Sequence, residues 1–106
     1  MLAFVAALAC GRDQPAGPEG VAAGYARDVE KLCDVVARSG AVSHDGNDRV
    51  FLVASWLGEN LETADARSLL ARIQPLEGEA KAEALEREAR RVGLAGCALA
   101  GEWRGR

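Results

Sequence analysis

Apolar residues recur at steps of three and four positions along most of the chain after residue 20. In the first such segment, which runs from Val21 to Arg38, they are Val21, Tyr25, Val29, Leu32, Cys33 and Val36. This spacing is the period of one helical face, so it predicts a helix that carries Cys33 on its inner side. Ser39-Gly40 ends the segment, with Gly40 as its left-handed C-terminal residue.

A polar loop at 43–48 precedes a second predicted helix, from about Arg49 to Glu59. Asn47 or Asp48 is expected to cap it. Its apolar face comprises Val50, Val53, Ala54 and Leu57, and Phe51 and Trp56 widen that face. This is the most hydrophobic of the predicted helices, so we expect it to lie at the centre of the fold.

Two more helices follow, and the clearest signals are at their ends. Thr63 is expected to cap a helix from Ala64 to Ile73, which Pro75 stops. Its inner face would be Ala66, Leu69, Leu70 and Ile73. The last helix begins at Leu76 or Glu77 and ends at Val92, and Gly93 is its C-terminal cap. Its inner stripe would be Ala82, Leu85, Ala89 and Val92.

The outer face of this last helix is expected to lie in water. Glu83 with Arg87, and Glu86 with Arg90, are spaced as i,i+4 ion pairs. After Gly93 we expect an irregular, partly buried tail, on which Trp103 docks or frays. Together these segments predict an all-α fold: a small four-helix domain spanning residues 21–106.

The first ten residues read as an export signal. An apolar run at 1–9 ends in Ala7-Leu8-Ala9 before Cys10, and a stretch with two Pro and three Gly follows to residue 20. The run resembles a bacterial lipoprotein signal, although Ala7 stands where that family usually has Leu. The resemblance implies lipidation of Cys10. We therefore expect a signal segment at 1–9, a flexible tether at 10–20 and a periplasmic or lipid-anchored location. The alternative is a cytoplasmic protein with three reduced cysteines, in which residues 1–9 pack internally.

Export changes the interpretation of the other two cysteines. Outside the cytoplasm, two remaining thiols in one small domain most simply pair, which predicts a Cys33–Cys97 disulfide. A redox-active pair would have C-x-x-C spacing, whereas these residues are 64 positions apart.

Composition argues against catalysis, metals and nucleic acid. The chain has a formal net charge of −3 and lacks the basic excess that binds nucleic acid. His44 is its sole histidine, which leaves no good zinc set and no convincing Ser-His-Asp group. The acidic loop at 45–48 resembles part of a calcium site but lacks the Gly and Glu that complete one. We expect no enzyme, no cofactor and no metal, and membrane contact only through the lipid anchor.

Four short segments loosely resemble small uncharacterised helical lipoproteins and secreted proteins of GC-rich Gram-negative bacteria. They are Leu32-Cys33, Ser39-Gly40-Ala41, Trp56-Leu57 and Cys97-Ala-Leu99. The resemblance implies no activity. Our leading hypothesis is a binding or accessory component of the bacterial envelope with an envelope protein as partner, and its first anchor candidates are Phe51, Trp56 and Trp103. The alternative is a small carrier that encloses an apolar ligand, which a cavity of a few hundred cubic ångströms would favour.

Overall fold

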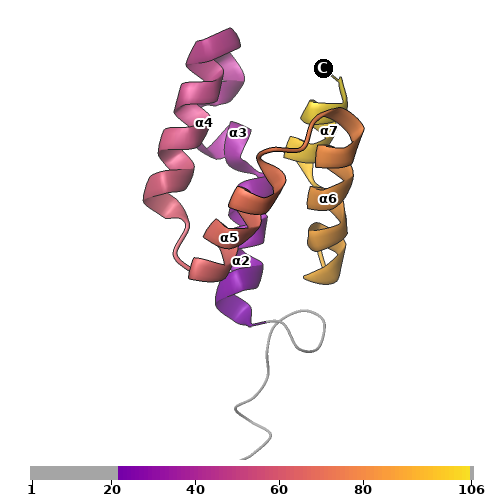
Figure 1. Cartoon of the computed structure of the whole chain (residues 1–106). Helices are drawn as coiled ribbons and strands as arrows, with labels where there is room; N and C mark the ends of the chain where they lie inside the picture. The colour runs from indigo at the N-terminus through magenta and orange to yellow at the C-terminus, as the bar shows by residue number, and fades with distance from the viewer. Residues whose placement is uncertain (1–21, 106) are drawn as a thin grey trace, which may run out of the picture.

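The computed structural model describes residues 22–105, and all regular structure in that range is helical (Figure 1). The elements are α2 (Ala23–Cys33), α3 (Val35–Arg38), the 3-10 turn η1 (Ala41–Ser43), α4 (Gly46–Asn60), α5 (Ala64–Ile73), α6 (Gly78–Arg91) and α7 (Ala98–Gly105). The all-α prediction is confirmed, but the predicted number of helices is wrong, because this range holds six α-helices. The expected signal at 1–9, Cys10 and the tether at 10–20 lie outside the described residues.

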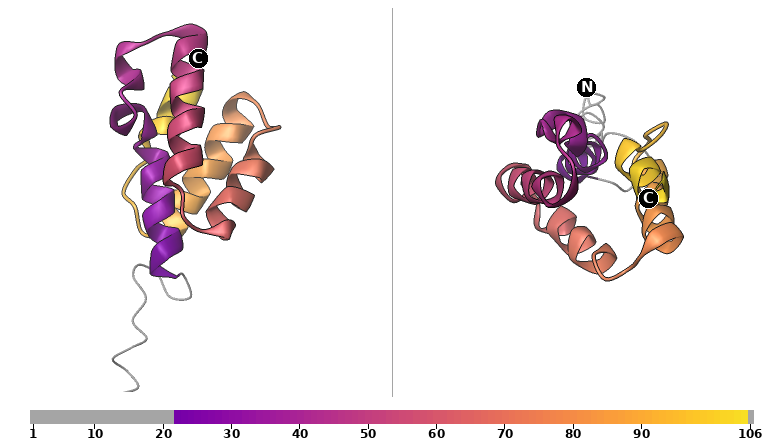
Figure 2. Two further views of the ribbon diagram at one scale, coloured as in Figure 1. Left: turned by 90° about the vertical axis from the view of Figure 1, so that its left-hand side faces the viewer. Right: turned by 90° about the horizontal axis from the view of Figure 1, so that it is seen from above.

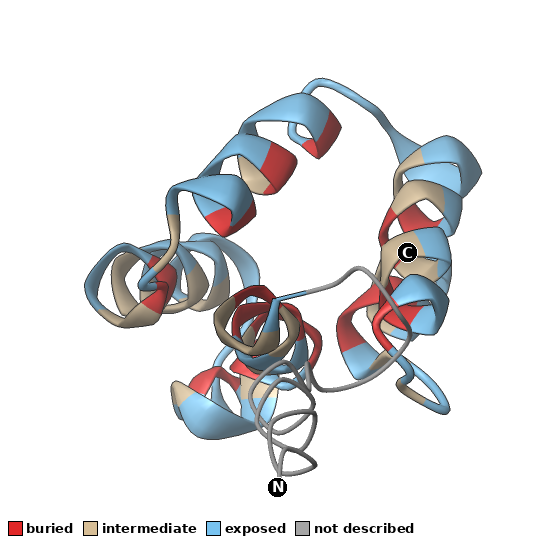
Figure 3. Cartoon of the chain, turned by 90° about the horizontal axis from the view of Figure 1, so that it is seen from below, coloured by how far each residue is buried: buried red, intermediate tan, exposed pale blue. Residues whose placement is uncertain are grey.

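Helix α2 is the centre of the fold. It contacts α4, α5, α6 and α7, and its predicted inner residues Tyr25, Val29, Leu32 and Cys33 are all buried. Seen from above, α4 lies on one side of the molecule, α6 and α7 on the other, and α5 between them (Figure 2). The buried residues face the middle of this arrangement on α5 and α6 (Figure 3).

The predicted first helix is interrupted at Asp34, where ψ is 8°. Cys33 and Val35 are both buried on either side of this residue. In one continuous helix, positions two residues apart point about 200° away from each other, so a single core could not bury both. The interruption therefore turns Val35 inward, and the predicted inner residue Val36 is only partly buried.

Helices α5 and α6 follow their sequence signals closely. The Thr63 hydroxyl accepts a hydrogen bond from the Ala66 amide and caps α5, as predicted. All four predicted inner residues of α6 are buried, and Gly93 ends the helix with a φ of 92°. On its outer face, however, Glu86 pairs with Arg104 of α7 rather than with Arg90.

The predicted irregular tail is wrong over residues 98–105, which form α7. Leu99 and Ala100 are buried in the core, and Trp103 packs against its edge. Ala, Leu, Glu and Arg favour helix, but a segment of eight residues is too short to be stable without such packing. Packing against residues distant in the sequence therefore stabilises α7 as a helix.

Helix α4 departs furthest from expectation. It begins at Gly46, so Asn47 and Asp48 lie inside its first turn and neither caps it. Only Leu57 among its residues is buried, which makes the prediction of a central helix wrong. Within the described range, the backbone of α4 lies close only to that of α2, α3 and η1. On its apolar face Leu57 is buried and Val53 packs against the core, whereas Val50 and Ala54 stay exposed.

Candidate functional site

An apolar cavity of about 560 Å³ lies beside the apolar residues of α4. The four residues predicted as the inner face of this helix form one of its walls: Val50, Val53, Ala54 and Leu57. Because α4 packs on the α2 side alone, Val50 keeps 66 % of its surface exposed. The periodicity thus identified the correct face, of which Leu57 and Val53 meet the core while Val50 and Ala54 border the open cavity.

The remaining apolar walls come from elements distant in the sequence. Leu32 and Val36 contribute from the first two helices, Leu70 and Ala71 from α5, and Leu99 and Trp103 from α7. Leu32 and Leu99 are buried, so this part of the wall belongs to the rigid core. The cavity is therefore bounded by core residues on one side and by α4 on the other.

An ion pair spans the cavity from α4 to α7. The Arg49 guanidinium lies 2.6 Å from a carboxylate oxygen of Glu102, and both side chains are more than four-fifths buried. The same guanidinium donates hydrogen bonds to the carbonyl oxygens of Ala41 and His44, at 3.0 and 2.7 Å. Arg49 thereby ties the loop before α4, and α4 itself, to α7.

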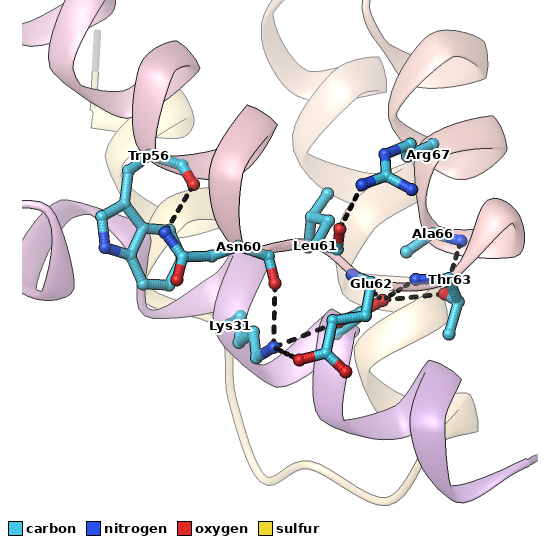
Figure 4. Close-up of polar contacts among 9 residues, drawn as sticks. Lys31, Trp56, Asn60, Leu61, Glu62, Thr63, Ala66 and Arg67 are labelled. Carbon is cyan, nitrogen blue, oxygen red and sulfur yellow. Dashed lines mark hydrogen bonds and ion pairs between the residues drawn. The ribbon is translucent and has the colours of Figure 1, made fainter.

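Two further cations line the cavity. The Lys81 ammonium lies 4.7 Å from the centre of the Trp103 ring, a cation–π contact between α6 and α7. The Arg67 guanidinium donates a hydrogen bond to the Leu61 carbonyl oxygen (Figure 4). Neither cation forms an ion pair with a carboxylate among residues 22–105. Sequence periodicity assigns the helix faces of both residues to solvent, so no pattern in the sequence singled them out.

A buried carboxylate fixes the loop that leads into α5. Asp28 is 1 % exposed and accepts hydrogen bonds from the Glu62 amide, the Thr63 amide and the Thr63 hydroxyl. Burial alone would raise the pKa of Asp28, but these hydrogen bonds and the Lys31 charge outweigh it and lower that pKa. Lys31 also donates to the Asn60 carbonyl oxygen, which closes the network (Figure 4).

A second polar contact joins α2 to α6. The Tyr25 hydroxyl donates to the Glu88 carboxylate at 2.6 Å, and the Arg91 guanidinium lies over the tyrosine ring. Burial, and then the hydrogen bond and charge of Glu88, raise the pKa of Tyr25 to about 12. Hydrogen bonds from Arg91 and Tyr25 lower the pKa of Glu88 despite its partial burial. Both contacts hold α2 and α6 together, away from the cavity.

The predicted disulfide is confirmed. Cys33 and Cys97 are bonded, with their Cα atoms 4.7 Å apart, and they join the end of α2 to the residue before α7. Leu99 and Trp103 follow within two turns, so this bond helps to position two of the residues that line the cavity.

The three predicted anchor residues do not gather in one place. Trp103 lines the cavity, Trp56 packs partly buried against the core, and Phe51 is 68 % exposed on α4. Phe51 is not among the lining residues, although its neighbour Val50 is. Of these two adjacent residues, Val50 therefore lines the cavity and Phe51 lies outside it.

Within residues 22–105, no cluster of three or more His, Cys, Asp or Glu side chains is placed to hold a metal ion. None of the helices described in that range has the length and apolar character needed to cross a membrane. Comparison of the chain with protein-family models, with curated proteins and with solved structures finds no match.

Proposed function

We propose that this protein is a non-enzymatic carrier or sequestering domain, which binds an apolar ligand in the cavity between α4, α5 and α7. The observation that carries the proposal is the exposed apolar surface that α4 presents to the cavity at Val50 and Ala54. Exposing apolar surface to water has a free-energy cost proportional to its area, so an occupant that covers Val50, Val53 and Ala54 would gain that energy.

The size and chemistry of the cavity support the same function. Its volume of about 560 Å³ falls inside the range of small-molecule sites, which are mostly apolar with a few polar groups. Here the polar groups are the Arg49–Glu102 pair, Lys81 and Arg67. None of them is arranged as a nucleophile with a base, so binding accounts for the site better than catalysis does.

The disulfide supports a location outside the cytoplasm. Structural disulfides persist in oxidising compartments, and the Cys33–Cys97 bond closes a long stretch of a small domain. We propose that the domain acts in the bacterial envelope, as the apolar run before Cys10 indicates.

A second candidate is an accessory domain that docks on an envelope protein through exposed apolar residues. Phe51 and Val42 favour it, with 68 % and 63 % of their surfaces exposed. This surface lies beside the cavity rather than in it, which allows the two candidates to be tested separately.

Binding of an uncharged naphthylamine dye, followed by fluorescence, tests the carrier function. The expected result is saturable binding to one site per chain. Val50→Glu should weaken it at least tenfold, because an unpaired carboxylate is costly to bury beside a ligand. Phe51→Glu is the matched control: it has the same exposure and the same new charge, but lies outside the lining.

A filling variant gives an independent test. Ala54→Trp places a large ring into the cavity from an exposed position, so it should abolish dye binding without unfolding the domain. Absence of saturable binding to the unmodified protein would overturn the carrier proposal. Equal weakening by Val50→Glu and Phe51→Glu would also contradict it, and would favour the docking surface around Phe51.

A further inference from the structure

We infer that the ligand is an amphiphile with one negative charge, a long-chain fatty acid, whose carboxylate binds Lys81. The inference rests on the proposed function and adds the chemical class of the ligand. It comes from the distribution of charge around the cavity, which differs from that of the whole chain.

The cavity lining is positive although the protein is negative. The chain carries a formal net charge of −3, whereas three cations and one carboxylate line the cavity: Arg49, Arg67, Lys81 and Glu102. Arg49 and Glu102 neutralise each other at 2.6 Å. Lys81 and Arg67 remain, and an anionic ligand would be the complementary partner for them.

Lys81 is the better placed of the two cations. Its side chain is partly buried, and its ammonium is held over the ring of Trp103, which also lines the cavity. An ammonium has three N–H donors, and stacking on a ring leaves them available for a carboxylate. Arg67 is exposed and already donates to the Leu61 carbonyl oxygen.

The separation of the cations favours a single charge on the ligand. Arg67 lies in the first half of α5, and Gln74, which lines the cavity near the start of α6, follows seven residues later. Lys81 lies in the first turn of α6, beyond the turn that joins the two helices, so the two cations are carried by separate helices. A phosphate dianion would require several donors together, whereas one carboxylate needs only one such cation. The alkyl chain would then lie against Val53, Leu57 and Leu70, which also line the cavity.

Displacement of the naphthylamine dye from the intact protein tests this assignment with three ligands of equal chain length: dodecanoate, dodecanol and dodecylammonium. They are compared below their micelle concentrations, at a pH where the acid is ionised. Dodecanoate should bind about tenfold more tightly than dodecanol, because a charge-assisted hydrogen bond replaces a neutral one. Dodecylammonium should bind more weakly than either.

Variants assign the preference to one residue. Lys81→Met keeps the length of the side chain and should remove the preference for dodecanoate, because it weakens dodecanoate binding much more than dodecanol binding. Lys81→Arg should retain the preference, which controls for loss of packing against Trp103. Arg87→Gln removes a cation from the exposed face of the same helix and should have no effect.

The outcomes separate this inference from the proposed function. If dodecanol and dodecanoate displace the dye equally well, the fatty-acid assignment is wrong and the carrier function stands. If Arg67→Gln, rather than Lys81→Met, removes the preference, the position of the carboxylate is wrong. If neither the dye nor any of the three ligands binds, the proposed function itself fails.

Discussion

The carboxylate of Asp28, in the middle of α2, accepts hydrogen bonds from both the amide and the hydroxyl of Thr63, at 2.7 and 2.8 Å. The Thr63 hydroxyl oxygen in turn accepts a hydrogen bond from the Ala66 amide at 3.1 Å, which caps α5. A buried side chain on the central helix thus determines where α5 begins. Because Leu70 and Ala71 of α5 line the cavity, this contact also positions one of its walls.

Removing this carboxylate should destabilise the domain strongly. Asp28→Ala leaves the donors of Glu62 and Thr63 without their acceptor, and we expect the free energy of unfolding to fall by about 3 kcal/mol. Urea denaturation followed by circular dichroism measures it. Asp34→Ala, at an exposed position, should change the stability by less than about 0.5 kcal/mol. Similar losses in the two variants would contradict a special role for Asp28.

The same contact predicts a particular dependence on acid. The pKa of Asp28 is lower in the folded protein than its ordinary value of 3.8, so the unfolded chain takes up this proton first as the pH falls. The stabilisation by Asp28 is therefore complete above the unfolded-state pKa and is lost through the folded-state pKa. The stability advantage of the unmodified protein over Asp28→Asn should be constant from neutral pH to about 5 and should shrink toward about pH 2. An advantage that grows in acid would show the wrong sign.

The parts of the fold that local chemistry determines could be predicted from the sequence. Thr63 and Gly93 act within one turn of the helix ends they cap, and the inner stripe of α6 follows from a period that needs no distant partner. The disulfide could be predicted because the expected export would leave two thiols with few alternatives to pairing with each other. The caps and the inner stripe depend only on residues close together in the sequence, and the disulfide depends on a choice among very few cysteine pairings.

The cavity could not be predicted, because an apolar helix face looks the same whether it meets a core or an empty volume. Val50 and Val53 have the spacing of core residues, and only the position of α4 relative to α7 shows that they are cavity residues. Lys81 likewise looks like an ordinary solvated residue until α7 brings Trp103 beneath it. Helix α7 itself depends on packing against residues distant in the chain.

Tyr25 offers a direct spectroscopic test of the α2–α6 contact, because it is the sole tyrosine of the sequence. Its phenolate absorbance should appear with a midpoint at about pH 12 in the folded protein. Glu88→Gln should move this midpoint toward 10, since it removes the acceptor charge that disfavours ionisation. Arg91→Ala should move it upward, because the Arg91 charge lowers this pKa. Shifts of the same sign in both variants would contradict the arrangement.

These titrations also have a consequence for stability in alkali. A pKa raised in the folded state means that folding favours the neutral phenol. This contribution is complete below the unfolded-state pKa near 10 and is lost as the pH rises toward 12. Rapid mixing to alkaline pH, with the absorbance read before the domain unfolds, separates ionisation of Tyr25 from unfolding.

The disulfide should account for a large part of the stability of the domain. Cys33 and Cys97 are 64 positions apart, and the chain-entropy model gives about 4 kcal/mol for closing a loop of this length. Replacing both residues with Ala should lower the free energy of unfolding by a comparable amount, measured by urea denaturation. Dithiothreitol should destabilise the unmodified protein and leave the double variant unchanged. Equal stability with and without the bond would show that packing alone holds α7 in place.

Arg49 and Glu102 should control access to the cavity. Within the described range, the backbone of α4 does not come close to α5, α6 or α7, so this ion pair is a side-chain connection across an otherwise open side. Arg49→Met should cost about 2 kcal/mol, because it removes the donor to the carbonyl oxygens of Ala41 and His44 and a buried ion-pair contact of Glu102. Amide hydrogen exchange should accelerate in residues 46–53, and bound dye should dissociate faster.

The control for this variant is Arg38→Met, which breaks an exposed ion pair with Asp34 on α3. Surface pairs of this kind contribute little, so exchange in α4 and dye dissociation should match those of the unmodified protein. If Arg49→Met left exchange in residues 46–53 unchanged, the packing of α4 on α2 and α3 would suffice to hold it. The Arg49–Glu102 pair would then border the cavity without governing the entry of a ligand.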